Sequence, residues 1–182
     1  MSRVCVLLAP GFEEIEAVTI IDVLRRADID TTALGIEGRR VEGSHGIVLH
    51  ADAVLGERAG ETWDMVVLPG GMPGSKNLRD TPEVQALLKR QHEEGGRLAA
   101  ICAAPIALSA AGVLEGRRAT SYPAFRDEIR CAQYLEQPVV VDGTVITSRG
   151  PGTAIDFALE LVKVLKNAAT AQQLAERMLV QS

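Results

Sequence analysis

Short runs of aliphatic residues recur along the chain, and each run ends at a turn. The clearest are residues 4–8, 64–68 and 98–101, which contain almost no polar side chains. A continuous apolar run of this length predicts a strand that is buried on both faces, because a strand with one exposed face alternates apolar and polar residues. Strands of this kind are typical of a parallel sheet, so the runs favour an α/β fold with helices on both faces.

The segments between these runs have the spacing of amphipathic helices. Residues 13–27 place Ala17, Ile20 and Leu24 on a broad apolar face, and we expect part of this face to meet another subunit. Thr81 is predicted to cap a helix that runs to residue 95, with Pro82 at its first position. Further helices are predicted at residues 103–111, at 153–165 with Thr153 as the cap, and at 168–178.

Two further stretches predict strands. Residues 31–36 read as a second parallel strand, and residues 38–49 read as a β excursion. Residues 139–147 predict a hairpin, because an Asp-Gly pair separates two β-branched runs. The alternation of strands and helices without a linker predicts one domain, residues 1–182, folded as a three-layer α/β sandwich around a mainly parallel sheet.

The composition restricts the classes of partner. The chain has 182 residues, of which 47% are hydrophobic and 24% are charged, and its formal net charge is −5. An acidic chain without a basic run argues against general binding to nucleic acid or to a membrane surface. Three cysteines without C-x-x-C spacing argue against a disulfide framework or a zinc site. No stretch reads as a signal peptide or a membrane span, so we expect a cytoplasmic protein.

Cys102 stands where a predicted strand meets a predicted helix. Gly95 and Gly96 precede the strand at 98–101, and helical spacing resumes after Pro105. A residue at such a sharp turn points its side chain out of the sheet, towards the N–H groups of the following helix. Those positive dipole ends favour the thiolate, which is the nucleophilic form of cysteine. The alternative is a small buried cysteine that only packs in the core.

Two other strand ends carry unusual residues. An acidic turn follows the first strand, and a carboxyl group from Glu13, Glu14 or Glu16 would act there as a proton donor or acceptor. Gly70 and Gly71 follow the strand at 64–68, and their N–H groups can approach a substrate oxygen closely. Strand ends of a parallel sheet meet in one crevice, so these groups are candidates to join the cysteine. The alternatives are a solvated first helical turn, which suffices for most of the acids, and a simple Gly-Gly turn.

The chain lacks the motifs of several other chemistries. No G-x-G-x-x-G, phosphate-binding loop or G-x-S-x-G is present, and no cluster has the spacing of metal ligands. His45 and His50 lie in the β excursion and are interpreted as structural or surface residues, and His92 is interpreted as a solvated helix residue. We therefore expect no cofactor and no metal.

Four segments together resemble one known family. They are residues 9–16 (APGFEEIE), 68–71 (LPGG), 100–105 (AICAAP) and 147–153 (TSRGPGT). In this order they are similar to the ThiJ/PfpI family, and most of all to its DJ-one and YajL branch. The resemblance runs over nearly the whole chain. It implies a flavodoxin-like sandwich, of the class I glutamine amidotransferase-like kind, that forms a homodimer.

The resemblance also implies roles for single residues. Cys102 matches the family's reactive, easily oxidised thiol at a nucleophile elbow, and Glu16 matches the buried acid that hydrogen-bonds the sulfur. Gly70, Gly71 and the N–H of Ala103 match the backbone that binds an oxyanion. The activities attributed to this branch are a glyoxalase that converts methylglyoxal to lactate without glutathione, protein deglycation, chaperone action and oxidative-stress sensing.

The sequence departs from related patterns at two positions. Tyr122 stands where part of the branch has a histidine, so Glu16 is expected to move protons alone, or with Tyr122 or water. Ala103 follows Cys102 where the peptidase branch has a histidine. Glutamine amidotransferases need a histidine after the nucleophile, and all three histidines of this chain precede it. Both of these relatives are therefore disfavoured.

These observations leave functions from different classes. In the first, Cys102 attacks the aldehyde of a small dicarbonyl or of a glycated protein, and Glu16, with a pKa raised by burial, shuttles a proton through an enediol. In the second, a redox-sensing holdase, Cys102 is oxidised to the sulfinic acid and protonated Glu16 hydrogen-bonds the product. A third is a housekeeping protein whose first helix serves only assembly.

Overall fold

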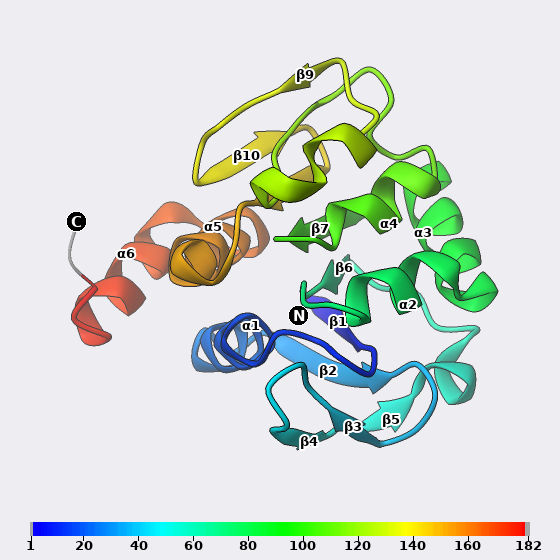
Figure 1. The fold of residues 1–182 in the computed structure, drawn as a ribbon. Helices are drawn as coiled ribbons and strands as arrows, with labels where there is room; N and C mark the ends of the chain where they lie inside the picture. The colour runs from blue at the N-terminus through cyan, green and yellow to red at the C-terminus, as the bar shows by residue number, and fades with distance from the viewer. Residues whose placement is uncertain (1, 181–182) are drawn as a thin grey trace.

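The computed structural model describes residues 2–180, which are organised around a seven-stranded sheet (Figure 1). The strand order is β10-β11-β7-β6-β1-β2-β5, and every neighbouring pair is parallel except β10 with β11. The predicted mainly parallel α/β sheet is therefore confirmed. The strands of this sheet are β1 (Arg3–Leu8), β2 (Asp30–Gly35), β5 (Ala53–Val54), β6 (Met65–Leu68), β7 (Arg97–Ile101), β10 (Val139–Asp142) and β11 (Val145–Ser148).

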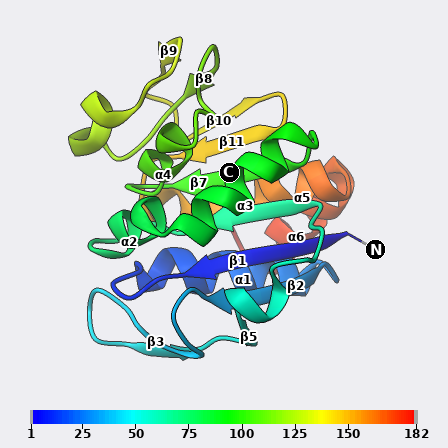
Figure 2. The same ribbon diagram turned by 90° about the vertical axis from the view of Figure 1, so that its right-hand side faces the viewer.

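Helices cover both faces of the sheet and complete the three layers. One face carries α1, α5 and α6, and the other carries α2, α3 and α4 (Figures 1 and 2). Helix α1 packs along α5, and α5 packs along α6. The helices are α1 (Glu14–Arg26), α2 (Gly74–Asp80), α3 (Pro82–Glu93), α4 (Pro105–Ala110), α5 (Ala154–Leu165) and α6 (Ala168–Arg177).

The two layers of helices explain why the central strands read as continuous apolar runs. In β1, Val4 and Val6 point into the core under α1 and α5, whereas Cys5 and Leu7 point into the core under α3 and α4. All four are 0% exposed. Successive side chains of a strand alternate between faces, so a strand with a core on each side needs an apolar residue at every position.

Smaller elements decorate the sheet edges. The expected β excursion is a hairpin of β3 (Arg40–Glu42) and β4 (Val48–His50), which lies between β2 and the edge strand β5 in the chain. A separate short strand, β8 (Arg118–Ala119), pairs with β9 (Gln133–Tyr134). Three 3-10 helices complete the elements: η1 (Leu55–Arg58), η2 (Pro123–Glu128) and η3 (Pro151–Thr153).

Two details differ from the sequence-based expectations. Helix α2 begins directly after Pro73, where the Pro-Gly-rich stretch had predicted only a turn. Thr81 and Thr153 stand at helix starts, but neither side chain caps its helix. The Thr81 hydroxyl instead donates to the carbonyl of Asn77 (2.6 Å), and the Thr153 hydroxyl donates to the carbonyl of Gly150 (2.9 Å). In both cases a carbonyl of the preceding turn lies close enough to take the hydroxyl away from the helix N–H groups.

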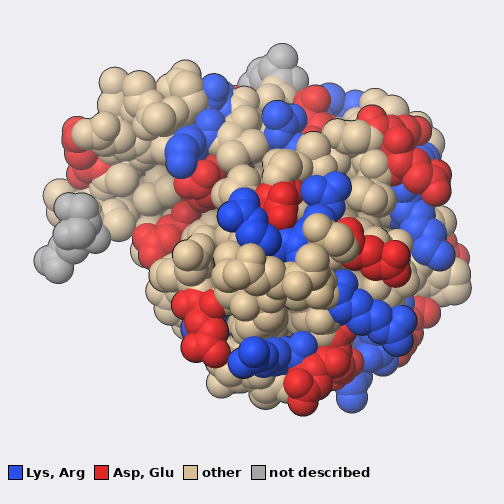
Figure 3. Space-filling model, turned by 90° about the horizontal axis from the view of Figure 1, so that it is seen from above, with Lys and Arg blue, Asp and Glu red and all other residues tan. Residues whose placement is uncertain are grey.

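The surface carries charges of both signs. On the face seen in Figure 3, acidic and basic side chains are interspersed and do not form one continuous basic patch. Within residues 2–180, no helix combines the length and the apolarity that crossing a bilayer requires.

Candidate active site

The carboxyl ends of three adjacent strands bring the candidate residues together. Strands β1, β6 and β7 are parallel neighbours, so their carboxyl ends lie at one edge of the sheet (Figures 1 and 2). The loop after β1 leads into α1 and Glu16, the loop after β6 contains Gly70 and Gly71, and β7 ends immediately before Cys102. This is the edge where ligands bind in sheets of this type.

Cys102 occupies a constrained turn between β7 and α4. Its φ is +63°, which few residues other than glycine adopt and which costs on the order of 1 kcal/mol or more. Two hydrogen bonds hold it there: its N–H donates to the carbonyl of Ser148 (3.0 Å), and its carbonyl accepts the N–H of Tyr122 (2.8 Å). Only 8% of the residue is exposed. The side chain is thus fixed at the edge of the sheet with a narrow opening to solvent.

The Glu16 carboxyl lies beside the thiol and is completely buried. Its Oε2 accepts the N–H of Gly70 at 2.7 Å, and its Oε1 has no hydrogen-bond partner within residues 2–180. A Cβ atom on Gly70 would lie 2.6 Å from Cys102 Cβ and 2.6 Å from Glu16 Oε2. Glycine at this position therefore lets the carboxyl and the thiol approach each other.

Burial changes the titration of both groups. Loss of solvation raises the pKa of Glu16 from 4.5 to about 7, although the Gly70 N–H and the thiol partly oppose the shift. Burial, followed by the charge of Glu16, raises the pKa of Cys102 to about 12. The expected raised pKa of Glu16 is confirmed. The expected resting thiolate is not found, because the N–H groups of Ala103 and Gly71 lower the thiol pKa by less than burial and Glu16 raise it.

Two backbone donors face the sulfur. The N–H groups of Gly71 and Ala103 both lie within hydrogen-bonding reach of Cys102, and Gly71 has a φ of +94° that suits glycine. Gly70 differs from the sequence-based expectation, because its N–H already donates to Glu16. Gly71 and Ala103 are thus the two donors placed to stabilise negative charge on an oxygen bound next to the sulfur.

The other two acids of the first turn of α1 are also buried, and the solvated alternative does not apply to them. Glu13 caps α1 by accepting the N–H of Glu16 (2.8 Å). Glu14 accepts the backbone N–H of His45 (2.6 Å) and contacts its Nδ1 (2.8 Å), which ties the β3–β4 loop to α1. Both residues therefore position α1 and its Glu16, although neither carboxyl contacts the thiol.

Glu13, Glu14 and His45 also have the spacing of cation ligands. One donor atom from each lies within 4.8 Å of the others. The oxygens of Glu14 are already hydrogen-bonded to the β3–β4 loop, and Glu13 is engaged at the helix cap. The arrangement is explained by these structural contacts without an ion.

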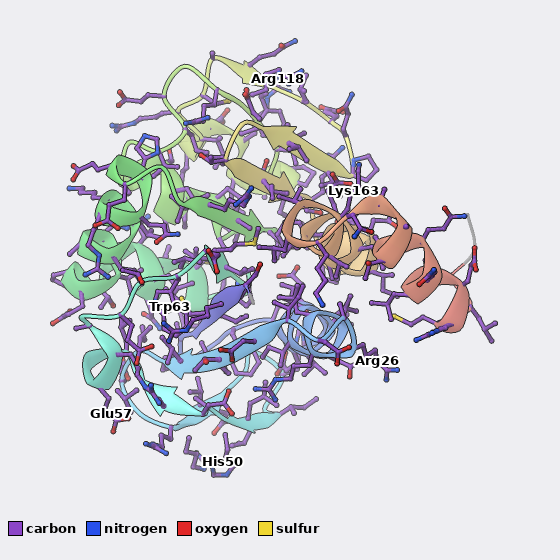
Figure 4. The ribbon with its side chains drawn as sticks, turned by 180° about the vertical axis from the view of Figure 1, so that it is seen from behind. Arg26, His50, Glu57, Trp63, Arg118 and Lys163 are labelled. Carbon is purple, nitrogen blue, oxygen red and sulfur yellow. The ribbon has the colours of Figure 1, made fainter. Side chains whose placement is uncertain are left out.

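Tyr122, His50 and His92 do not belong to the buried pair formed by Cys102 and Glu16. Tyr122 is 45% exposed and forms the rim of the site, where its backbone N–H holds Cys102. His50 lies at the end of β4 on the outer edge of the molecule (Figure 4), and His92 lies in α3. Sequence reasoning missed Ser148, whose carbonyl holds the Cys102 N–H, because a backbone acceptor leaves no sequence signal.

Comparisons with known proteins agree with this geometry. The model of the DJ-1/PfpI family matches residues 2–164. The chain belongs to this family. A solved structure of oxidized DJ-1 from Toxoplasma gondii superposes with a TM-score of 0.96 at 38% identity, and each chain is covered over 100% of its length. The DJ-1/PfpI fold expected from the four motifs is therefore confirmed.

Individual DJ-1/PfpI relatives differ in length. Protein dj-1beta of Drosophila melanogaster is 42% identical over 178 residues, which cover 96% of this chain and 95% of the relative. The glutathione-independent glyoxalase DJR-1.2 of Caenorhabditis elegans is 37% identical over 164 residues, which cover 88% and 87%. The chain spans only 46% of the length of Protein DJ-1 homolog A of Arabidopsis thaliana, to which it is 39% identical.

Proposed function

We propose that this protein is a cysteine-dependent, glutathione-independent glyoxalase that acts on methylglyoxal-type dicarbonyls. The observation that carries the proposal is the pairing of the Cys102 thiol with Glu16, whose pKa of about 7 suits proton transfer near neutral pH. The name of the 37% identical Caenorhabditis elegans relative supports it.

The reaction begins with addition of the thiol to the aldehyde. As the S–C bond forms, Glu16 takes the thiol proton and then passes it to the aldehyde oxygen, which becomes the hydroxyl of a hemithioacetal and leaves Glu16 ionised. The N–H groups of Gly71 and Ala103 stabilise the negative charge that develops on this oxygen. A neutral resting thiol is consistent with this step, because the base that removes its proton already lies beside it.

The later steps move two protons and add one water. Glu16 takes the proton of the hemithioacetal carbon and passes it to the ketone oxygen, which gives an enediol. It then takes the proton of the former aldehyde hydroxyl and delivers it to the ketone carbon, so that a thioester of the 2-hydroxy acid forms. Water then cleaves the thioester and restores the thiol. The sum is one dicarbonyl plus one water to one hydroxy acid, with no external oxidant or reductant.

Protein deglycation follows from the same chemistry. Early adducts of methylglyoxal with protein thiols and amines form reversibly, so an enzyme that consumes the free dicarbonyl also removes them. We therefore propose that the protein also reverses early glycation of other proteins, because it consumes the dicarbonyl that their adducts release.

Methylglyoxal consumption with identification of the product tests the proposal. Wild type should form lactate, and Cys102→Ser and Glu16→Gln should each lose at least about 100-fold in rate, because each lacks one partner of the proton transfer. Cys131→Ser is the matched control, since Cys131 lies on the chain after β8, outside the site. Full lactate formation by Cys102→Ser would rule out the proposal.

A redox-sensing holdase is the second candidate function. It is favoured by the protonated form of Glu16, which can donate a hydrogen bond to a Cys102 sulfinate, and by the oxidized state named for the Toxoplasma gondii relative. Limited peroxide should then add two oxygens to Cys102 before the half-buried Cys131 reacts, as read by peptide mass spectrometry. Equal oxidation of both cysteines would exclude a specific sensor.

We further propose a homodimer and a cytoplasmic location. The dimer is supported by apolar side chains left exposed on α1 and α5, namely Ile15 (58%), Val18 (46%) and Ile155 (41%).

A further inference from the structure

A groove lies along Tyr122, at the rim of the site, and is not used by the chemistry described above. Its volume is about 290 Å³, and its lining includes Tyr122, Arg149 and Pro151. Two hydrogen bonds join the walls of this groove to Cys102: the Tyr122 N–H donates to the Cys102 carbonyl, and the carbonyl of Ser148, next to Arg149, accepts the Cys102 N–H. These bonds connect the backbone of both groove walls to the backbone of the residue that carries the thiol.

The walls of the groove are mostly apolar. The Tyr122 ring lies over the backbone of Gly150, where an added Cβ would be 3.4 Å from the ring, and prolines continue the wall on both sides. A methylglyoxal molecule bound to Cys102 engages only the thiol, Glu16 and two N–H groups. The groove thus offers space for whatever extends from the carbonyl carbon of a longer substrate.

One charged side chain lines this groove. Arg149 is half-buried, and within residues 2–180 its guanidinium makes neither an ion pair nor a hydrogen bond. By contrast, Arg79, Arg118 and Arg126 each pair with a carboxylate. A partly desolvated guanidinium without a protein acceptor gains most from a ligand oxyanion, which it binds through paired N–H donors.

We infer that the site selects 2-oxoaldehydes whose far end bears a carboxylate, with Arg149 as the residue that binds this carboxylate. The inference rests on the proposed dicarbonyl chemistry of Cys102. The aldehyde meets the thiol and Glu16, the chain of the substrate lies along Tyr122, and its carboxylate pairs with the guanidinium. Arg149 is a specificity-determining residue and takes no part in the proton transfers.

Two substrates that differ by one charge test this inference. The ratio of kcat/KM for 4,5-dioxopentanoate to kcat/KM for its methyl ester should fall roughly tenfold in Arg149→Gln, as expected for loss of one partly screened ion pair. Arg149→Lys, which keeps the charge, should recover most of the ratio. Arg177→Gln removes an exposed arginine of α6 that pairs with no carboxylate of residues 2–180, and it serves as the matched control. An unchanged ratio in Arg149→Gln would overturn the inference.

A second readout does not depend on turnover. Iodoacetate and iodoacetamide alkylate the same thiol, but only iodoacetate carries a charge, so the ratio of their rates at Cys102 reports the local potential. Arg149→Gln should lower this ratio at least about threefold, and the effect should shrink at high salt. If wild type turns over neither oxoaldehyde, the proposed function fails, and the alkylation ratio alone decides whether Arg149 attracts anions to the site. An unchanged alkylation ratio overturns the inference.

Discussion

The buried carboxyl of Glu16 makes the stability of the fold depend on pH. Its pKa rises from 4.5 to about 7 on folding, so the folded chain holds this proton more tightly than the unfolded chain does. The stabilisation is complete below pH 4.5 and is lost as the pH rises through about 7. Above that pH the fold carries a charge on a completely buried carboxyl group, which destabilises it.

Glu16→Gln should remove that cost. Glutamine stays neutral and can still accept the Gly70 N–H, so the variant should be more stable than wild type by up to about 3 kcal/mol at pH 8, and nearly equal to it below pH 4.5. Urea unfolding at the two pH values gives the difference. A stability difference that stays the same at both would show that the carboxyl is not strained by burial.

Gly70 provides a second test at the scale of single residues, because its missing side chain lets the Cys102 thiol and the Glu16 carboxyl approach each other. Gly70→Ala places a methyl group 2.6 Å from both Cys102 Cβ and Glu16 Oε2, so one of them must move. We expect methylglyoxal turnover to fall at least about 100-fold while the circular dichroism spectrum is kept. Gly56→Ala is the matched control, since a Cβ added there would meet nothing within 4 Å. Wild-type turnover in Gly70→Ala would contradict the close pairing.

At the scale of elements, the β3–β4 hairpin holds the start of α1. Glu14 accepts hydrogen bonds from the loop at His45, and the Ser44 N–H donates to the carbonyl of Phe12 (2.8 Å). The loop also closes against Gly11, whose N–H donates to the carbonyl of Glu42. A segment far from the nucleophile thus fixes the helix that carries Glu16.

Glu14→Ala should loosen this connection. It leaves partly buried N–H groups of the loop without their acceptor, and we expect a loss of about 1–3 kcal/mol in the free energy of unfolding at neutral pH. Burial raises the pKa of Glu14, but the hydrogen bonds from His45 and Ile47 outweigh it and lower the pKa, so the loss should shrink as the pH falls below 4.5, where the carboxylate of wild type also disappears. Chemical unfolding at both pH values measures it, with exposed Glu93→Ala as the control. Equal losses in the two variants would contradict this role.

Elements whose own residues carry a characteristic pattern were predictable from the sequence, and elements that depend on distant residues were not. Strands β1, β6 and β7 were predictable because both faces of each strand are buried, which requires a continuous apolar run. Helix α2 was missed because Pro73 and Gly74, normally turn residues, here begin a helix. The separate roles of Glu13, Glu14 and Glu16 could not be assigned from spacing alone, since they depend on the hairpin and on Gly70, which lie far away in the sequence.

The whole molecule presents an unpartnered apolar surface on α1. Ile15 and Val18 are exposed there, and Ile155 lies on the adjacent α5. Val18→Asp should weaken a dimer at least about tenfold, because it buries a charge against an apolar contact. Light scattering should then give the 19.4 kDa monomer for the variant and twice that mass for wild type. A monomeric wild type would contradict the proposed dimer.

The central claim, that Cys102 forms a covalent intermediate and Glu16 moves its proton, is tested most directly by one measurement. Protein mixed with methylglyoxal is quenched in acid, and intact mass with peptide mapping locates any adduct. Wild type should carry one methylglyoxal on Cys102 that appears before lactate and decays as lactate forms. Glu16→Gln lacks the base for both steps, so it should form the adduct more slowly and form almost no lactate. Lactate formed without any adduct on Cys102, or at an undiminished rate by Glu16→Gln, would contradict the account.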